Sequence, residues 1–322
     1  MAIGLTIGAA IAIAQTSGAS TGVDGHGLRR ARLYGVASGK TLNSLNRNDS
    51  RAAIKAWFDI VARQRGFLLD SKVDVVDSVM EMRERLQNHS VELLMLSITD
   101  YLELESSRLA VPALTHAPSS EGVGLHSYFL LAKTSSSAAT ISSLRGKSIL
   151  VSSRNGSNTG LAWIDVLLGS EKPERAASFF ASAQVVEKPQ ACILPLFFGR
   201  VDACVVDEVN FNLAKEMNPQ VGQLKVLARS RPLIESIITT AEPRPYQNEL
   251  IEAMLSLHES PGGRQLLTVF RTERLVRIQP GDLDSARELW RDYYRLPGSS
   301  PNRPPNAPGP ETVHVERPKE RY

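Results

Sequence analysis

The chain has 322 residues, of which 42% are hydrophobic and 22% charged, the balance of a globular protein with one large core or two smaller ones. Its 37 Lys and Arg residues exceed its 34 Asp and Glu residues by only three and are scattered, so no nucleic-acid partner is expected. The two cysteines lie in no metal-ligand spacing and the six histidines are isolated, so neither a metal site nor a cofactor is expected.

The first residues form an apolar run from Ala2 to Ala14, followed by small and polar residues. An A-x-A cleavage pattern ends at Ala14, so we expect residues 1–22 to be a secretory leader, although no Lys or Arg occurs before Arg29. The run falls short of the ~20 residues that a transmembrane helix needs. The mature protein is therefore expected to be exported, soluble and periplasmic.

The apolar residues of the first half alternate between strand and helix periodicity. They predict strands at 31–37, 72–78, 91–98, 125–133 and 149–151, and helices at 49–66, at 79–89 and from about Asn158. A Ser-rich loop at 135–143 separates the last two of these strands. The alternation favours an α/β fold with a parallel sheet.

The second half continues this alternation and then becomes helical. It predicts strands at 182–188, 201–208 and 224–230, and helices at 189–199, 245–258, 262–271 and 282–294. Pro195 should bend the helix at 189–199, and Phe197 and Phe198 in it are interpreted as core residues. The proline-rich segment 297–322 has too few apolar residues to offset its ordering entropy, so we expect it to be disordered.

The only cysteines are Cys192, in the predicted helix at 189–199, and Cys204, in the strand that follows. In an oxidising compartment they can form one disulfide. Two buried free thiols are the alternative, and the sequence does not choose between them.

The stretch "SILVSSRNGSNTG" runs from a short buried strand through a polar turn into a helix that begins near Asn158. Gly156 and Gly160 let the backbone approach a guest closely. The first N–H groups of a helix lack internal partners and carry the positive end of its dipole, so such a turn suits an anion. An ordinary helix cap is the alternative, since Ser, Asn and Thr also favour that position.

A family resemblance is carried by "LRGK", "NGSNTG", "FFGRVDA" and "VLARS" in this order, with "YGVA" and "SITDYLEL" earlier in the chain. The sequence resembles the phosphate/phosphonate-type (PhnD-like) periplasmic substrate-binding proteins of ABC importers. The resemblance implies the type II fold, in which two Rossmann-like lobes are joined by two hinge strands, here near 122–130 and 229–238. Lobe one would comprise 31–122 plus 234–295, lobe two would comprise 127–230, and a ligand would lie in the cleft between them.

In that family an S-T-S-G turn binds phosphoryl or phosphonyl oxygens. Its counterparts here are Ser157, Asn158, Thr159 and Gly160, and the resemblance implies free amide hydrogens around Thr159 that face the cleft. Phosphonate-binding members also place a histidine just before the next helix of this lobe. This chain reads "EKPQA" there, with Lys188 and Gln190 as candidates to replace the histidine.

Further candidate ligand-binding residues follow the ends of other predicted strands. They are Asn46, Asn48, Asp49, Ser97, Thr99 and Tyr101 in lobe one, and Asp207 and Glu208 in lobe two. Asp49 is equally well explained as a helix cap, and Tyr101 as a half-buried packing residue. Asp207 and Glu208 would receive a ligand amine, or else be solvated carboxylates at the end of a strand.

No Walker A motif, G-x-G-x-x-G motif or H-E-x-x-H pair occurs, and the G-x-S-x-G match at 18–22 has no helix after it, so no catalytic residue is assigned. We therefore expect a monomeric, non-enzymatic protein that captures a small oxyanion and delivers it to an ABC permease. The alternative is a ligand-sensing or interaction module that uses the same fold to signal to a membrane partner.

Overall fold

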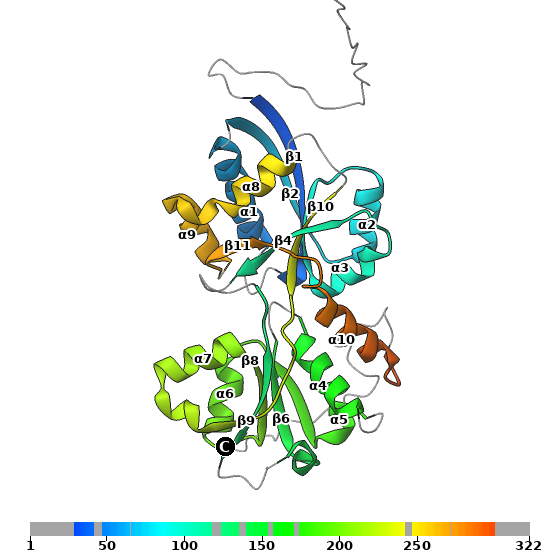
Figure 1. The fold of residues 1–322 in the computed structure, drawn as a ribbon, viewed down its shortest axis with the longest axis vertical. Coiled ribbons are helices and arrows are strands. Elements are labelled where there is room, and N and C mark those ends of the chain that lie inside the picture. Colours follow the sequence, from blue (N-terminus) through cyan, green and yellow to red (C-terminus); the bar gives the residue numbers. More distant parts are fainter. Residues whose placement is uncertain are drawn as a thin grey trace, which may run out of the picture.

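The computed structural model describes residues 29–299 except 42–46, 65, 118–123, 135–139, 154–156, 171–173, 242–246 and 271. The predicted leader, most of the predicted tail and Asn46 lie outside these residues. The described residues form two α/β lobes, one above the other in Figure 1, each built on its own sheet. Within the described part, every helix is too short or too polar to cross a membrane.

Lobe one contains a six-stranded sheet in the order β11-β4-β10-β3-β1-β2. Its strands are β1 (Arg29–Ser38), β2 (Phe67–Val76), β3 (Leu93–Ser97), β4 (Val111–Ala117), β10 (Ser236–Thr240) and β11 (Arg274–Arg277). β1 is parallel to β2 and β3, but β10 is antiparallel to both β3 and β4. The parallel sheet favoured by the sequence is thus present in β1, β2 and β3, but β10 enters from the hinge and runs against the direction of β3.

Helices cover both faces of this sheet. They are α1 (Arg47–Gln64), α8 (Gln247–Leu255) and α9 (Pro261–Val269) on one face, and α2 (Val79–Gln87) and α3 (Ile98–Glu105) on the other. Side chains alternate along each strand, so Leu33 and Ala37 of β1 pack towards α1 whereas Val36 packs towards α2 and α3. Both faces of the strands are therefore apolar, as in other sheets covered on both sides.

Lobe two contains a five-stranded sheet in the order β7-β6-β8-β5-β9. Its strands are β5 (Tyr128–Lys133), β6 (Ser148–Ser152), β7 (Ser182–Val186), β8 (Ala203–Asp207) and β9 (Leu224–Arg229). Its helices are α4 (Thr159–Gly169) and α5 (Ala176–Phe179) on one face, and α6 (Gln190–Phe197) and α7 (Glu208–Met217) on the other. Since β6 is parallel to β7 and β8, the carboxyl ends of these three strands lie on the same side of the sheet, and the helices α4, α6 and α7 all begin there.

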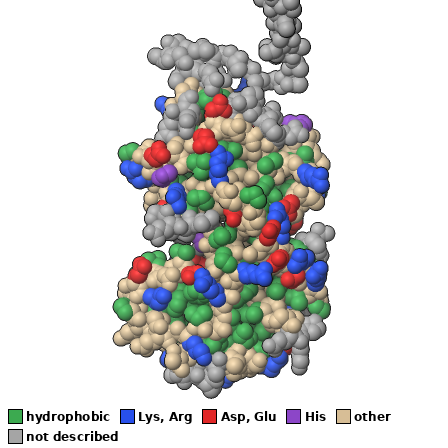
Figure 2. Space-filling view, in the orientation of Figure 1, with side chains coloured by type: hydrophobic (Ala, Val, Ile, Leu, Met, Phe, Trp, Pro, Cys, Tyr) green, Lys and Arg blue, Asp and Glu red, His purple; other side chains and the backbone are tan. Residues whose placement is uncertain are grey.

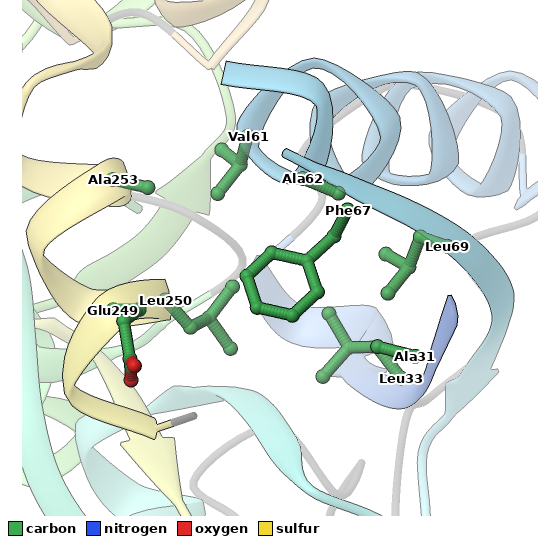
Figure 3. A pocket seen from close by; sticks show the side chains of 9 residues that line it. All are labelled: Ala31, Leu33, Val61, Ala62, Phe67, Leu69, Glu249, Leu250 and Ala253. Carbon is green, nitrogen blue, oxygen red and sulfur yellow. The ribbon is translucent and has the colours of Figure 1, made fainter. Parts of the chain in front are cut away.

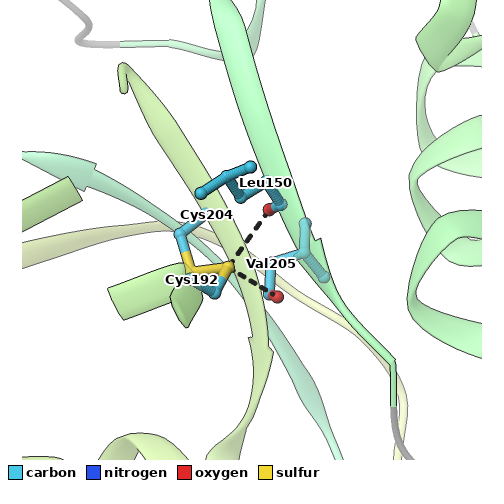
Figure 4. The surroundings of a disulfide bond; sticks show 4 residues. All are labelled: Leu150, Cys192, Cys204 and Val205. Atoms are coloured by element: carbon cyan, nitrogen blue, oxygen red, sulfur yellow. Dashed lines mark hydrogen bonds between the residues drawn. A yellow bond between two sulfur atoms is a disulfide. The ribbon is translucent and has the colours of Figure 1, made fainter. Parts of the chain in front are cut away.

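A disulfide joins Cys192 of α6 to Cys204 of β8, with the two Cα atoms 5.6 Å apart (Figure 4). Both residues are fully buried in the apolar cluster between the sheet and α6. The Sγ atom of Cys192 lies 3.2 Å from the carbonyl oxygen of Leu150 and 3.3 Å from that of Val205. Of the two alternatives left open by the sequence, the structure therefore has the disulfide.

Several elements differ from the sequence-based predictions. β2 begins at Phe67, five residues earlier than the predicted strand at 72–78, and the helices α3 and α7 directly after β3 and β8 were missed. The interpretation of Phe198 as a core residue was wrong, because its side chain is 63% exposed just after the end of α6. Phe197 does pack against the cluster around the disulfide.

The described part of the hinge is a pair of antiparallel segments between the lobes (Figure 1). His126 and Leu233 exchange both backbone hydrogen bonds at 2.8 Å, and the amide of Ser230 donates to the carbonyl of Tyr128 at 2.8 Å. These residues fall inside the two hinge segments expected from the family resemblance.

The last helix, α10 (Asp284–Arg295), lies between α3 of lobe one and α4 of lobe two (Figure 1). Arg287 donates to Glu105 at the end of α3, with a shortest N–O distance of 2.5 Å. Trp290 and Tyr293 pack against Ala162 in the first turn of α4. Acidic and basic side chains gather beside the waist on this side of the molecule (Figure 2). The helix is thus a further connection between the lobes.

Candidate functional site

The turn at the start of α4 contains the four residues expected to bind phosphoryl or phosphonyl oxygens, with Thr159 and Gly160 already in the helix. Ser157, Asn158 and Thr159 are 4%, 7% and 1% exposed, so the turn is buried and does not lie on an open surface. The hydroxyl oxygens of Ser157 and Thr159 are 2.5 Å apart, and the amide of Thr159 donates to Ser157 Oγ at 3.2 Å. The expectation that the Thr159 amide is free was therefore wrong, because a side chain of the turn itself takes that hydrogen.

Two other polar atoms at or near this turn have no hydrogen-bond partner. Asn158 occupies the N-cap position of α4, but its side chain makes no capping hydrogen bond, and its buried Oδ1 atom has no hydrogen-bond partner. Ser152 Oγ, at the end of β6, is likewise buried without a partner. Buried polar atoms are normally hydrogen-bonded, so these two oxygens are exceptions that remain able to form a hydrogen bond.

Gly160 is closely packed at the start of α4. A Cβ atom at this position would lie 3.1 Å from Cε1 of Tyr128 and 3.3 Å from Cγ1 of Val205. The ring of Tyr128 therefore lies directly against the backbone of the first turn of α4. It also stacks on Trp163 one turn later, with ring centroids 6.4 Å apart.

Lobe one carries a similar turn at the start of α3. The hydroxyl oxygens of Ser97 and Thr99 are 2.8 Å apart, and Ser97 Oγ accepts from the amide of Asp100 at 3.2 Å as the N-cap. Ser97 is buried and Thr99 half-buried. Two of the candidate residues of lobe one thus form the same Ser-x-Thr arrangement as Ser157 and Thr159.

Glu235 of the hinge connects these two turns. Its backbone oxygen accepts from the amide of Ile98, the first residue of α3, at 2.8 Å. Its carboxylate accepts from the phenol of Tyr128, whose ring packs on Gly160. The starts of α3 and α4 are therefore joined through one hinge residue and one aromatic side chain, both of which the sequence-based search missed.

A buried ionic group lies near the start of α3 in lobe one, and the sequence did not predict it. The fully buried carboxylate of Asp100 accepts from Ser38 Oγ at 2.5 Å and from Lys40 Nζ at 2.5 Å. Ser38 ends β1, and Asp100 lies in the first turn of α3. The carboxyl ends of the neighbouring parallel strands β1 and β3 bring them together, so the missing signal was the strand order.

Other candidate residues lie elsewhere or face away from these turns. Asn48 and Asp49 are exposed in the first turn of α1, and Lys188 and Gln190 are exposed at the start of α6. The phenol of Tyr101 donates to Glu105 Oε1 on its own helix at 3.1 Å. Burial, together with the charge of Glu105, raises the pKa of Tyr101 to about 12, so this phenol stays neutral.

The two carboxylates after β8 have partners within lobe two. Asp207 is the N-cap of α7 and accepts from the amide of Asn210 at 3.0 Å and from its side chain at 2.6 Å. Glu208 pairs with Arg229 at 2.7 Å. Both lie at the carboxyl end of β8, on the side of the sheet where α4 begins. Their partners in the structure are groups of lobe two, so neither carboxylate depends on a ligand amine to balance it.

Two hollows lie away from the Ser-x-Thr turns. One, of about 30 Å³, lies between β1, β2, α1 and α8, and its lining side chains are apolar except for Glu249 (Figure 3). The other, of about 610 Å³, is an open groove beside β11 that contains the paired Arg277 and Glu252. The first lacks donors for an anion, and the second mixes both charge signs, so neither matches the chemistry of the turns.

Comparison with known proteins identifies the class. Residues 43–283 match the family model described as "ABC transporter, phosphonate, periplasmic substrate-binding protein". The match covers well over half of the chain, so the protein belongs to this PhnD-like family of periplasmic binding proteins. Among curated proteins, none matches the sequence significantly.

Solved structures of low sequence identity share the fold. PhnD1 from Prochlorococcus marinus, in complex with methylphosphonate, has a TM-score of 0.55 at 13% identity, covering 81% of this chain and 97% of that one. XAC2383 from Xanthomonas citri, bound to ATP, has a TM-score of 0.56 at 15% identity, covering 82% and 98%. A binding protein component of an ABC phosphonate transporter from Pseudomonas aeruginosa has a TM-score of 0.54 at 10% identity, covering 82% and 87%. These likenesses establish the two-lobed type II fold.

Proposed function

We propose that this protein is an exported, monomeric binding protein that captures a small oxyanion between its lobes and delivers it to an ABC permease. The observation that carries the proposal is the turn before α4. There, two hydroxyl groups, the start of an eleven-residue helix and the buried side-chain oxygen of Asn158, which has no hydrogen-bond partner, lie together. Family membership and the fold supply the context in which such a turn serves binding.

The chemistry of the turn suits a negative guest. The first amides of α4 carry the positive end of its dipole, and an anion there gains ~0.3–1 kcal/mol when exposed and up to ~2 kcal/mol when partly buried. Each hydrogen bond to a charged group contributes ~1.5–3 kcal/mol. Several together reach micromolar affinity, about 8 kcal/mol, after the costs of ordering.

The second Ser-x-Thr turn extends the proposed site across the cleft. Ser97 and Thr99 present the same pair of hydroxyl groups at the start of α3, and Lys40, held by Asp100, lies at that edge. We include these three residues as contacts from lobe one. Asn46, Asn48, Lys188 and Gln190 stay predictions, and closure of the lobes would be needed to bring the exposed ones to the guest.

Export is the second part of the proposal. Members of the family work outside the cytoplasm, and the Cys192–Cys204 disulfide fits an oxidising compartment. A sensory module would share the binding turn and differ in its membrane partner. Crosslinking in membranes followed by identification of the partner separates the two, since recovery of a histidine kinase or another signalling protein in place of permease subunits would contradict transport.

The binding site is tested by thermal unfolding of the purified protein with a panel of ligands. The panel contains phosphate, phosphite, methylphosphonate, methanesulfonate and ATP, and we expect at least one to raise the unfolding temperature. The double variant Ser157→Ala/Thr159→Ala should lose that shift. Ser170→Ala, at the opposite end of α4 and exposed, is the matched control and should keep it. An undiminished shift in the double variant would remove the assignment of the site.

A further inference from the structure

Tyr128 is a residue of lobe two whose side chain is held from lobe one. It is the first residue of β5, and it is fully buried. Its phenol donates to the carboxylate of Glu235, which directly precedes β10 of the lobe-one sheet. The backbone oxygen of Glu235 accepts from the amide of Ile98, the first residue of α3, at 2.8 Å. The hydrogen bond between phenol and carboxylate therefore runs from one lobe to the other.

The backbone of Tyr128 is held by the same returning segment of the hinge. The amide of Tyr128 donates to Ser230 Oγ at 2.8 Å, and its carbonyl oxygen accepts from the amide of Ser230, also at 2.8 Å. Ser230 is itself buried, so water competes little for these hydrogen bonds. Residues 230–235 thus hold Tyr128 both at its backbone and at the tip of its side chain.

The ring of Tyr128 in turn supports the first turn of α4. A Cβ atom at Gly160 would lie 3.1 Å from Cε1 and 3.2 Å from Cδ1 of this ring, so the ring and the helix backbone are closely packed. Trp163, on the same helix, stacks on the ring as well. Close-packed interiors are barely compressible and transmit a displacement from one group to the next. The orientation of the turn at 157–160 therefore depends on where the phenol is held.

We infer that Tyr128 and Glu235 are positioning residues through which lobe one sets the orientation of the binding turn at the start of α4 in lobe two. The inference rests on the proposed function, because it takes that turn as the binding site. Groups that are ordered before a guest arrives bind it more tightly, since the guest need not order them. Without the hydrogen bond between the lobes, ring and turn are ordered only when the guest binds, at a cost in affinity.

Three variants separate this role from direct contact with the guest. Tyr128→Phe keeps the ring against α4 and removes only the phenolic oxygen. Glu235→Ala removes the acceptor, whereas Glu235→Gln keeps a side-chain oxygen that accepts from the phenol. Tyr34→Phe makes the same change as Tyr128→Phe at a half-buried tyrosine of β1, within lobe one, and is the matched control.

Calorimetric titration with methylphosphonate, or with the panel member that raises the unfolding temperature most, measures the affinity. Tyr128→Phe and Glu235→Ala should each raise the dissociation constant at least fivefold. The double variant Tyr128→Phe/Glu235→Ala should raise it no further than the larger single effect, because both changes remove the same hydrogen bond. Glu235→Gln and Tyr34→Phe should stay within twofold of the unaltered protein.

Thermal unfolding verifies that each variant folds, and if Glu235→Ala does not, Tyr128→Phe and Glu235→Gln still carry the test. Unchanged affinity in Tyr128→Phe overturns the inference. So does a double variant whose effect is the product of the single effects, or a Glu235→Gln variant as weak as Glu235→Ala. Each of these results leaves the proposed function standing if Ser157→Ala/Thr159→Ala still abolishes binding. Absence of binding by every member of the panel overturns both.

Discussion

Nη1 of Arg175 donates to the phenolic oxygen of Tyr293 at 3.2 Å, and this contact fixes the end of α10 to lobe two. The same guanidinium donates to the carbonyl oxygen of Pro297 at 2.9 Å and lies 3.4 Å from the buried Asp165 carboxylate. At its other end, α10 is held to lobe one by the Arg287–Glu105 pair. A single helix therefore carries contacts to both lobes beside α4.

Replacing Arg175 should loosen this attachment. Arg175→Ala removes hydrogen bonds from a charged group and leaves the Asp165 carboxylate with its backbone bond to Ala176 but without a cation. We expect the free energy of unfolding to fall by about 1.5–3 kcal/mol, measured by urea denaturation. Arg145→Ala, which breaks an exposed pair with Glu174 that does not involve α10, is the control and should change stability much less. Equal losses in the two variants would contradict the assigned role of Arg175.

Gly160→Ala tests the packing of α4 on Tyr128. The new Cβ atom meets the Tyr128 ring at 3.1 Å, so the ring or the helix must shift. Overpacking of this kind costs about 1–3 kcal/mol, which outweighs the ~0.5–1 kcal/mol that alanine gains over glycine in a helix. We expect a lower unfolding temperature and weaker binding of whichever panel ligand is active.

The matched control is Gly262→Ala, which also alters the second residue of a helix. There the new Cβ atom meets only Ile60 Cδ1, at 3.9 Å, an ordinary contact. This variant should be at least as stable as the unaltered protein. A Gly160→Ala variant that behaves like Gly262→Ala would show that Tyr128 does not constrain α4.

The disulfide should contribute substantially to the stability of lobe two. Cys192 and Cys204 are 12 residues apart, and closing a loop of about this length in the unfolded chain stabilises the folded state by about 3 kcal/mol on the chain-entropy model. Cys192→Ala/Cys204→Ala should therefore unfold at lower urea concentration. Adding a reductant should destabilise the unaltered protein and leave the double variant unchanged. A reductant effect of the same size in both proteins would argue against the bond.

Asp74 should make stability depend on pH in the acid range. Its hydrogen bond from Arg85, at 2.6 Å, holds the pKa of Asp74 below its ordinary value of 3.8. A carboxylate with a lowered pKa in the folded state adds stability above pH 3.8, and that stability is lost as the pH falls through the folded pKa.

Comparison with Asp74→Asn measures this contribution. The difference in unfolding free energy between the two proteins should be largest near neutral pH and should shrink as the pH falls below 3.8. A difference in unfolding free energy that stays about the same from pH 6 to pH 2 would mean that the pKa of Asp74 is not lowered in the folded state.

Much of the fold was readable from the sequence because long apolar stretches fix their own secondary structure. The α/β class, the position of β6 and the start of α4 near Asn158 follow from such patterns and from the polar turn between them. Short elements such as β11 and the helix α3, whose buried face includes Tyr101 and Leu104, were missed because their patterns are too brief to separate from the neighbouring strand or loop.

The candidate site was only partly readable, for a different reason. Ser157 to Gly160 and Ser97 to Thr99 are local motifs that follow strands, so sequence spacing locates them. The link through Tyr128 and Glu235, and the pairing of Lys40 with Asp100, join residues far apart in the chain. Such contacts depend on strand order and on the return of the chain through the hinge, which periodicity alone does not specify.

The Cys192–Cys204 bond has a practical consequence for observing the protein. Both cysteines of the chain are consumed in it and buried, so the native molecule presents no thiol to a fluorescent or spin-active reagent. A cysteine introduced in place of Met80 on lobe one or Met217 on lobe two, which are 69% and 76% exposed, would then be the sole labelling position. A donor and an acceptor dye at these two positions would report changes in the distance between the lobes through energy transfer.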